Sequence, residues 1–246
     1  MKIVYWIAAA AVGLTVGACG PKRLEGGGSD VATSWTKAVV YVPGKADTVA
    51  PANVDLTSPR PVVVYLHGCS GISPHNDIQW AKFLRDIGFI VVQPDSLARR
   101  DRGKSCDANT AMHMDPTVHP LRLEEAAYAL GQLQREKWAD PRNIFLMGHS
   151  EGAIAAARTT LPEWRGVIVS SWLCTEPRYK SFDGLFVPRD TPVLTMGWDQ
   201  DPWYYGTRWQ GSCADKFDGR PNAKNITFSG KQHTTCLLYT SPSPRD

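Results

Sequence analysis

Short apolar runs alternate with helical patterns along most of this chain, and this alternation limits the fold more than any other feature. The runs are rich in β-branched residues and lie at residues 38–42, 61–66, 89–93, 143–147, 166–170, 192–196 and 225–228. Apolar residues recur at helical spacing within residues 80–87, 121–138 and 153–160. Continuous apolar strands separated by helices predict an α/β fold, in which a mostly parallel central sheet carries helices on both faces.

The composition excludes several classes of protein. The chain has 246 residues, which corresponds to one domain of ordinary size. Its formal net charge is only +3 and its basic residues are scattered, whereas a nucleic-acid-binding domain needs a basic stripe or a known motif. We therefore expect one globular domain that is a monomer and has no nucleic-acid partner.

The strand at residues 143–147 leads directly into Gly148-His149-Ser150-Glu151-Gly152, and a helix of small residues follows. A sharp turn from strand to helix strains the backbone of the middle serine, and only small neighbours leave room for it. The turn would raise the Ser150 hydroxyl above the sheet edge as a nucleophile. The backbone N–H of Glu151, at the start of the helix, is then an expected donor to a developing oxyanion. His149 and the Glu151 side chain are expected to support the turn rather than to react.

A second oxyanion donor is expected from the loop after the strand at residues 61–66. This loop reads His67-Gly68-Cys69 and follows the strongest strand signal in the chain. A loop after an earlier strand supplies the second N–H wherever a strand–serine–helix turn carries the nucleophile. We expect the backbone N–H of Cys69 to be this donor.

A serine hydroxyl is a poor nucleophile and needs a base that is oriented by a carboxylate. Among the six histidines, only His233 follows Ser150 with room for an acid between them. Two aspartates come after the strand at residues 192–196. The pattern of hydrolases that this motif resembles, a glycine followed after two or three residues by an aspartate and a proline turn, implies Asp201 as the acid; Asp199, which is closer to the strand end, is the alternative.

Aromatic residues are frequent in the loops after the later strands. Trp172, Trp198 and Trp203 are candidate walls of a substrate pocket, and packing of a long loop onto the domain explains them equally well.

His75 and Asp77 could be read as metal ligands, but no second cluster of ligands follows at a recognised spacing, so we expect no metal ion. No motif indicates a cofactor.

The N-terminus reads as a secretory signal rather than as part of the fold. A positive start precedes an apolar run to Val16, and small residues then lead to Cys19. Small residues before a cysteine resemble the cleavage site of bacterial lipoproteins, in which the cysteine carries the lipid; an ordinary signal peptide is the alternative. We expect a signal at residues 1–18 and a lipidated Cys19 with a flexible tether at 19–37. The protein would then be exported to the periplasmic side of a bacterial membrane, and Gly20 favours the outer membrane.

Export implies an oxidising compartment, in which cysteines form disulfides. Cys69, Cys106, Cys174 and Cys213 allow three connectivities. We expect Cys69–Cys106 and Cys174–Cys213, because each pair would join neighbouring loops on one edge of the sheet. Four free, buried thiols are the alternative.

The C-terminal residues 236–246 show neither a helical nor a strand period. They resemble the translation of a sequencing adapter, so we expect them, with Cys236, to be foreign to the natural protein. The domain is then expected at residues 38–235 and to lack its natural C-terminal segment.

Together these motifs resemble the dienelactone hydrolase branch of the α/β hydrolases, over roughly residues 39–233. The matching pieces are Leu66-His-Gly-Cys-Ser-Gly71, residues 80–89, Pro94-Asp95-Ser96 with Arg99-Arg100, Gly148-His-Ser-Glu-Gly152, residues 197–201 and His233. The region around Cys106 resembles exported members of this branch. The founding enzymes use a cysteine nucleophile where this chain has Ser150, so lactone specificity is not carried over. Family members also end with a helix after the catalytic histidine, and this sequence has no such helix.

The resemblance implies a serine hydrolase that cleaves carboxylic esters of small molecules through an acyl-enzyme intermediate. Two alternatives stay open at this point. A peptidase of the same fold usually carries an extra gating domain, for which this chain has no room. A non-catalytic binding lipoprotein would not need a serine, a histidine and an acid in this order.

Overall fold

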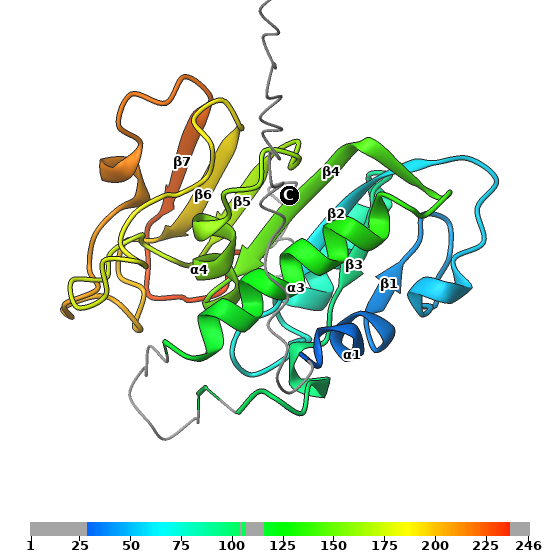
Figure 1. Ribbon diagram of the computed structural model, residues 1–246. Helices are drawn as coiled ribbons and strands as arrows, with labels where there is room; N and C mark the ends of the chain where they lie inside the picture. The colour runs from blue at the N-terminus through cyan, green and yellow to red at the C-terminus, as the bar shows by residue number, and fades with distance from the viewer. Residues whose placement is uncertain (1–28, 104, 107–115, 237–246) are drawn as a thin grey trace, which may run out of the picture.

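The computed structural model describes residues 29–103, 105–106 and 116–236, and within them one seven-stranded sheet forms the centre of the molecule (Figure 1). Its strand order is β1-β3-β2-β4-β5-β6-β7. Only β1 runs antiparallel to its neighbour, and every other neighbouring pair is parallel, as the sequence predicts. The predicted signal at residues 1–18, Cys19 and residues 237–246 lie outside the described residues.

The strands are β1 (Val39–Tyr41), β2 (Arg60–Leu66), β3 (Ile90–Gln93), β4 (Ala139–His149), β5 (Val167–Ser170), β6 (Val193–Trp198) and β7 (Ala223–Phe228). The α-helices are α1 (Val31–Thr36), α2 (Asp77–Asp86), α3 (Val118–Leu133) and α4 (Glu151–Arg158). In the described ranges, three short 3-10 helices lie at Pro51–Asn53, Ser96–Ala98 and Cys213–Lys216.

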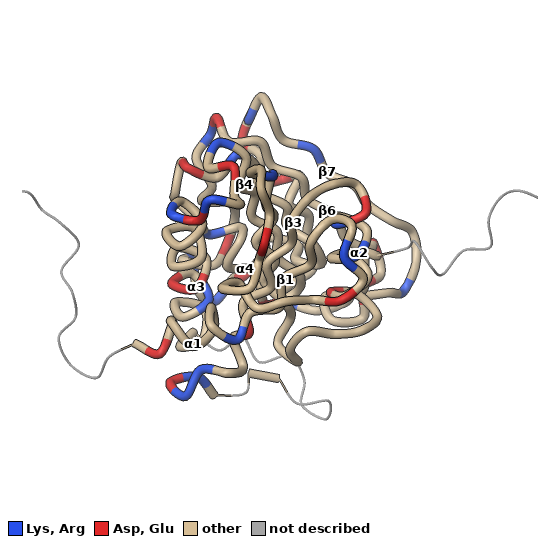
Figure 2. Tube along the Cα trace, turned by 90° about the vertical axis from the view of Figure 1, so that its right-hand side faces the viewer, with Lys and Arg blue, Asp and Glu red and all other residues tan. Residues whose placement is uncertain are grey.

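The helices cover both faces of the sheet, as predicted. Figure 2 shows the layers edge-on, with α1 and α3 on one side of the sheet and α2 on the other. Helix α3 contacts α1 and α4, whereas α2 contacts β1, β2 and β3. This arrangement leaves the carboxyl ends of the parallel strands at one edge, where their loops can meet.

Strand β2 shows how the sequence produces two cores. Successive side chains of a strand point to opposite faces. Val62, Val64 and Leu66 therefore join the larger core beneath α1, α3 and α4, while Val63 and Tyr65 join the smaller core beneath α2. All five side chains are almost fully buried, which explains why β2 reads as a continuous apolar run rather than as an alternating one.

The folded domain begins earlier than residue 38, so the expected tether at residues 19–37 is too long. Helix α1 packs against α3, and its Trp35 belongs to the larger core. Asp30 receives hydrogen bonds from the backbone N–H and side chain of Arg100, which fixes the start of this segment. A six-residue helix is too short to show a period, and for this reason the sequence did not reveal it.

The longest helix is shifted relative to its predicted range of residues 121–138. Helix α3 begins at Val118 because Pro120 is tolerated in a first helical turn. It ends at Leu133, and the buried Trp138 lies in the turn that leads into β4. Among the described residues, no helix is both long enough and apolar enough to cross a bilayer.

Candidate active site

Four strand ends bring the predicted site residues to the same edge of the sheet. The His67–Cys69 loop follows β2, Ser150 follows β4, Asp201 follows β6 and His233 follows β7. In open parallel sheets ligands bind in the crevice outside these carboxyl ends. The fold thus gathers residues that are up to 166 positions apart in the sequence, from 67 to 233.

Ser150 lies in the sharp turn between β4 and α4. Its backbone has φ 54° and ψ −117°, a conformation that costs energy for any residue with a side chain. A Cβ atom at Gly148 would lie 2.1 Å from the carbonyl oxygen of Gly152, and one at Gly152 would lie 2.2 Å from that of Leu66. Both glycines are therefore required by close backbone approach, which is the reason that the sequence pattern implied.

The loop after β2 lies against the Ser150 turn. A Cβ atom at Gly68 would lie 3.5 Å from the Cβ of Ser150, so the next residue, Cys69, is also near the hydroxyl-bearing carbon. Glu151 is the first residue of α4, and the first four N–H groups of a helix have no acceptor within it. The two residues predicted to supply oxyanion donors, Cys69 and Glu151, thus belong to two different segments that both adjoin Ser150.

Asp201, and not Asp199, is paired with His233. Nδ1 of His233 lies 2.7 Å from Oδ2 of Asp201, which is 1% exposed. Oδ1 of Asp201 accepts a hydrogen bond of 2.9 Å from the N–H of Trp203. Asp199 is exposed and accepts the N–H of Gly230, so it stabilises the turn after β7 instead.

The Asp201 pairing fixes the tautomer of His233. A carboxylate can only accept, so Nδ1 carries the proton and Nε2 presents a lone pair. Nε2 is buried and has no hydrogen-bond partner among the described residues. The imidazole lies beside the Ser150 turn, with its ring centre 5.1 Å from that of His149. A buried acceptor without a partner is costly in a purely structural role.

The segment after His233 is held in place by side chains from several elements. Indole N–H groups of Trp198 and Trp80 donate to the Thr234 carbonyl and the Thr235 hydroxyl, at 2.7 and 3.2 Å. The Asn76 carbonyl oxygen accepts the N–H of Thr235 at 3.2 Å. These contacts anchor the segment that carries His233 at the edge of the sheet.

Tyr204 is a site residue that the sequence did not single out among the aromatic residues after the later strands. It is 1% exposed, and its hydroxyl donates to the Ser171 carbonyl at 2.9 Å. Burial and the nearby Asp201 carboxylate raise the pKa of this hydroxyl well above its usual value, while a hydrogen bond with the Ser150 side chain opposes the shift. Its position three residues after Asp201 could have indicated that it lies near the site. Nothing in the sequence distinguishes it from Tyr205, which is exposed.

The three tryptophans named as candidate pocket walls do not lie together. The Trp203 ring packs 5.4 Å from the His233 ring and borders the site. Trp172 and Trp198 line a separate cavity of about 170 Å³, which Ser150 and His233 do not line. The Trp172 ring packs against the Tyr204 ring, with 5.6 Å between the ring centres. Trp172 therefore contacts the site only through Tyr204.

Two buried histidines near the turn are held neutral. Burial lowers the pKa of His149 well below its usual value, and the nearby His233 lowers it further. Burial also lowers the pKa of His67, and the charge of Arg122 adds to this effect. The N–H of Ser96 donates to Nε2 of His67, so Nδ1 of His67 carries its proton and donates it to the Gly68 carbonyl at 2.6 Å. His67 thus stiffens the loop that leads to Cys69.

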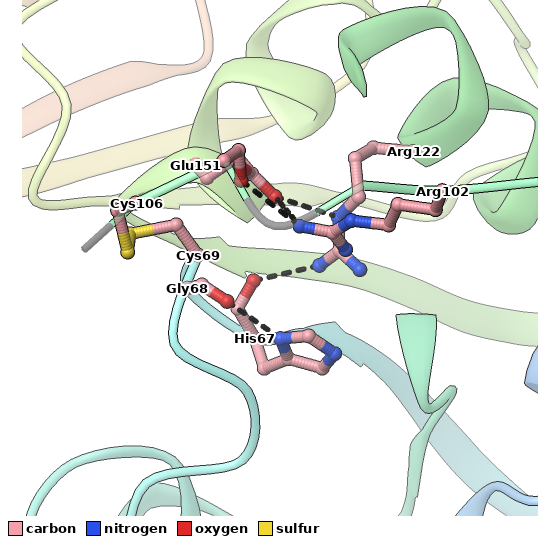
Figure 3. The surroundings of a disulfide bond; sticks show 8 residues. His67, Gly68, Cys69, Arg102, Cys106, Arg122 and Glu151 are labelled. Carbon is pink, nitrogen blue, oxygen red and sulfur yellow. Dashed lines mark hydrogen bonds and ion pairs between the residues drawn. A yellow bond between two sulfur atoms is a disulfide. The ribbon is translucent and has the colours of Figure 1, made fainter. Parts of the chain in front are cut away.

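Both expected disulfides, Cys69–Cys106 and Cys174–Cys213, are present. The first one joins the loop after β2 to the segment after β3, next to a buried group of charged side chains (Figure 3).

Within the described part of the chain, no group of three or more His, Cys, Asp or Glu side chains could hold a metal ion.

Comparison with known proteins identifies the fold. No family model matches the sequence, and no curated protein matches it. An esterase from Pyrococcus furiosus superposes with a TM-score of 0.55 at 15% identity, over 74% of this chain and 79% of the other. A phospholipase/carboxylesterase from Dyadobacter fermentans gives 0.52 at 19% identity, over 81% and 90%.

A Klebsiella pneumoniae protein described as a dienelactone hydrolase gives a TM-score of 0.50 at 13% identity, over 73% of this chain and 78% of the other. The protein therefore has the fold of the α/β-hydrolase superfamily, as its sequence motifs implied. At these identities the likeness concerns the fold, and the chemistry has to be argued from the site itself.

Proposed function

We propose that this protein is a serine hydrolase that cleaves carboxylic ester bonds of small molecules. The observation that carries the proposal is the Asp201–His233 pair beside the strained Ser150 turn, in which the buried Nε2 of the imidazole has no hydrogen-bond partner in the part of the chain that the structure describes. The carboxyl ends of parallel strands, where these residues lie, are where open α/β sheets bind their ligands. The esterase and hydrolase structures that share the fold favour the same reaction class.

In the proposed mechanism, Nε2 of His233 takes the proton from Oγ of Ser150 as Oγ attacks the ester carbonyl carbon. The carbonyl oxygen becomes an oxyanion and accepts hydrogen bonds from the N–H groups of Cys69 and Glu151. Asp201 keeps the imidazole in the required tautomer and stabilises the imidazolium. His233 then gives its proton to the departing alkoxide, which leaves as an alcohol, and Ser150 remains acylated.

Deacylation repeats these steps with water as the nucleophile. His233 removes a proton from water, the hydroxide adds to the acyl carbon, and the bond to Oγ breaks as His233 returns the proton to Ser150. The carboxylic acid is released, and the site requires no metal or cofactor for either half of the reaction.

Hydrolysis of p-nitrophenyl esters of graded acyl length by the purified protein tests the proposal. Wild-type protein should release p-nitrophenol, and Ser150→Ala should lose at least about 1,000-fold in kcat, because the nucleophile is removed. Ser58→Ala is a matched control, since Ser58 is exposed and remote from the site in the sequence. Turnover of esters but not of the corresponding anilides would favour the esterase over the peptidase. A folded wild-type protein that is inert toward all of them would contradict the proposal.

We further propose that the protein is exported and anchored to a bacterial membrane through a lipid on Cys19. The two disulfides favour an oxidising compartment, because such bonds are rare in the cytosol. Expression in a bacterial host followed by membrane fractionation tests this. Wild-type protein should sediment with membranes, and Cys19→Ala should not carry the lipid. A Cys19→Ala protein with the same mass shift and the same sedimentation as wild type would contradict the anchor.

A further inference from the structure

The two proposed oxyanion donors come from separate segments of the chain, the loop after β2 and the start of α4. An oxyanion hole works only when both N–H groups point at one oxygen position, and a displacement of about 1 Å can cost about 100-fold in rate. Some structural element must therefore hold the Cys69 segment and Glu151 at a fixed separation. Figure 3 shows the charged side chains beside these two segments and their contacts with Glu151 and the His67 carbonyl.

Arg122, on α3, bridges the two donor segments directly. Its Nη2 donates to the His67 carbonyl at 2.6 Å, and its Nε lies 3.7 Å from Oε1 of Glu151. Its Nη1 donates to Glu125 at 2.8 Å, one turn further along α3. The side chains of Arg122 and Glu125 are both fully buried, so this contact is shielded from water.

Arg102, in the segment after β3, binds the same carboxylate oxygen of Glu151. Its Nη2 lies 2.6 Å from Oε1 of Glu151 and 3.2 Å from the hydroxyl of Ser105. Ser105 in turn donates to the second oxygen of the Glu151 carboxylate. The residue after Ser105 is Cys106, which is bonded to Cys69. Arg102 and Ser105 are therefore hydrogen-bonded to one donor residue, and the neighbouring Cys106 is covalently bonded to the other.

The charges of this cluster also bear on the reaction. Glu151 carries its carboxylate on the same residue whose N–H is a proposed oxyanion donor, and it is only 7% exposed. An uncompensated carboxylate there would repel the negative charge that develops on the substrate. Arg102 and Arg122 both pair with Glu151, while Glu125 pairs with Arg122 and with the buried Arg99, so the Glu151 carboxylate is compensated by positive charge.

We propose that Arg102, Arg122 and the Cys69–Cys106 disulfide position the oxyanion hole, holding the Cys69 and Glu151 N–H groups at the separation that the transition state requires. This inference rests on the proposed serine hydrolase function. Arg102 and Arg122 are positioning residues, because they act through Glu151 and the loop after β2. Their removal weakens contacts made only in the transition state, so kcat falls while KM stays nearly constant.

The test compares Arg102→Met and Arg122→Met with Arg99→Met in the full-length protein. Arg99 is a matched control because it is buried beside the same cluster but binds Asp101, Glu124 and Glu125, not the two donor segments. Active sites are titrated with a fluorophosphonate, so that kcat is expressed per reactive serine and unfolded protein does not count. We expect kcat to fall about 10- to 100-fold for the first two variants and less than threefold for Arg99→Met, with KM within threefold throughout.

Cys106→Ser is the second variant, because it leaves every charge of the cluster in place and opens only the disulfide. We expect it to lose at least about fivefold in kcat. Unchanged kcat in Arg102→Met, Arg122→Met and Cys106→Ser, in an active wild-type background, would overturn this inference alone. An equal loss in Arg99→Met would also overturn it, since the effect would then be general destabilisation. A folded wild type that neither reacts with the fluorophosphonate nor hydrolyses esters would overturn the proposed function as well.

Discussion

Replacing Asp201 with asparagine tests the geometry around His233 with a change of one atom. Both carboxylate oxygens of Asp201 are acceptors, one for Nδ1 of His233 at 2.7 Å and the other for the N–H of Trp203 at 2.9 Å. Asparagine offers one oxygen and one NH₂ group, so it cannot accept from both. Asp201 is 1% exposed, and water cannot substitute for the lost acceptor.

Either orientation of the new amide is unfavourable. If its oxygen stays with Trp203, its NH₂ faces Nδ1 of His233 and forces the proton onto Nε2, where the base needs a lone pair. If its oxygen faces His233, its NH₂ opposes the N–H of Trp203 in a buried site. The first arrangement removes the general base. We therefore expect kcat to fall about 10⁴-fold, which corresponds to about 5.5 kcal/mol of transition-state stabilisation.

The assay is steady-state hydrolysis of a p-nitrophenyl ester by Asp201→Asn and by Asp199→Asn, with thermal melts of both proteins. Asp199→Asn is the matched control, because an exposed asparagine oxygen can still accept the N–H of Gly230. Its kcat should stay within about twofold of wild type. The reasoning would be refuted if Asp201→Asn kept more than a tenth of the wild-type kcat, or if Asp199→Asn were the inactive variant.

Three further predictions concern stability. Gly152→Ala should lower the free energy of unfolding by about 3 kcal/mol or more, because its Cβ would lie 2.2 Å from a backbone oxygen of β2. Gly131→Ala is the matched control on α3, where a new Cβ meets open space, and it should raise the free energy of unfolding by about 0.5–1 kcal/mol. Urea titrations would measure both, and equal effects would contradict the packing argument. Cys213→Ser opens a disulfide with a sequence separation of 39 residues and should cost roughly 4 kcal/mol, measured the same way; a loss below about 1 kcal/mol would count against it. Because burial lowers the pKa of His67 and His149, the unfolded chain binds protons that the folded chain excludes, so stability should fall below about pH 6.5 by about 1.4 kcal/mol per pH unit for each imidazole. Equal unfolding free energies at pH 7.5 and pH 5.5 would contradict this.

The parts of the fold that local sequence patterns determine could be predicted. Each apolar run corresponds to a strand, because a strand buried on both faces needs apolar residues at every position, as in β2. The turn at Ser150 was recognisable because its glycines are dictated by contacts within a few residues and with the neighbouring strand. Helix α1 was missed because its six residues are too few to show a period.

The parts that depend on contacts between distant segments could not be predicted in the same way. The sequence allowed both Asp199 and Asp201 as partners of His233, and only the path of the loop after β6 decides between them. Arg122 and Glu125 lie on the same face of α3 as the buried Ala126 and Leu133. Charged residues at the apolar positions of a helical pattern indicate a buried ion pair, so this pair could have been recognised from the sequence. Their partners in other segments were not recognisable from that pattern.

Mass spectrometry of the protein after reaction with a fluorophosphonate tests the central claim most directly, because it identifies the nucleophile whatever the natural substrate is. The account predicts one adduct per chain, which peptide mapping assigns to Ser150, and no adduct in Ser150→Ala. Prior unfolding in urea should abolish labelling, since the reactivity depends on His233 and Asp201. An adduct on another residue, or a folded wild-type protein that stays unlabelled, would contradict the assignment of Ser150 as the nucleophile.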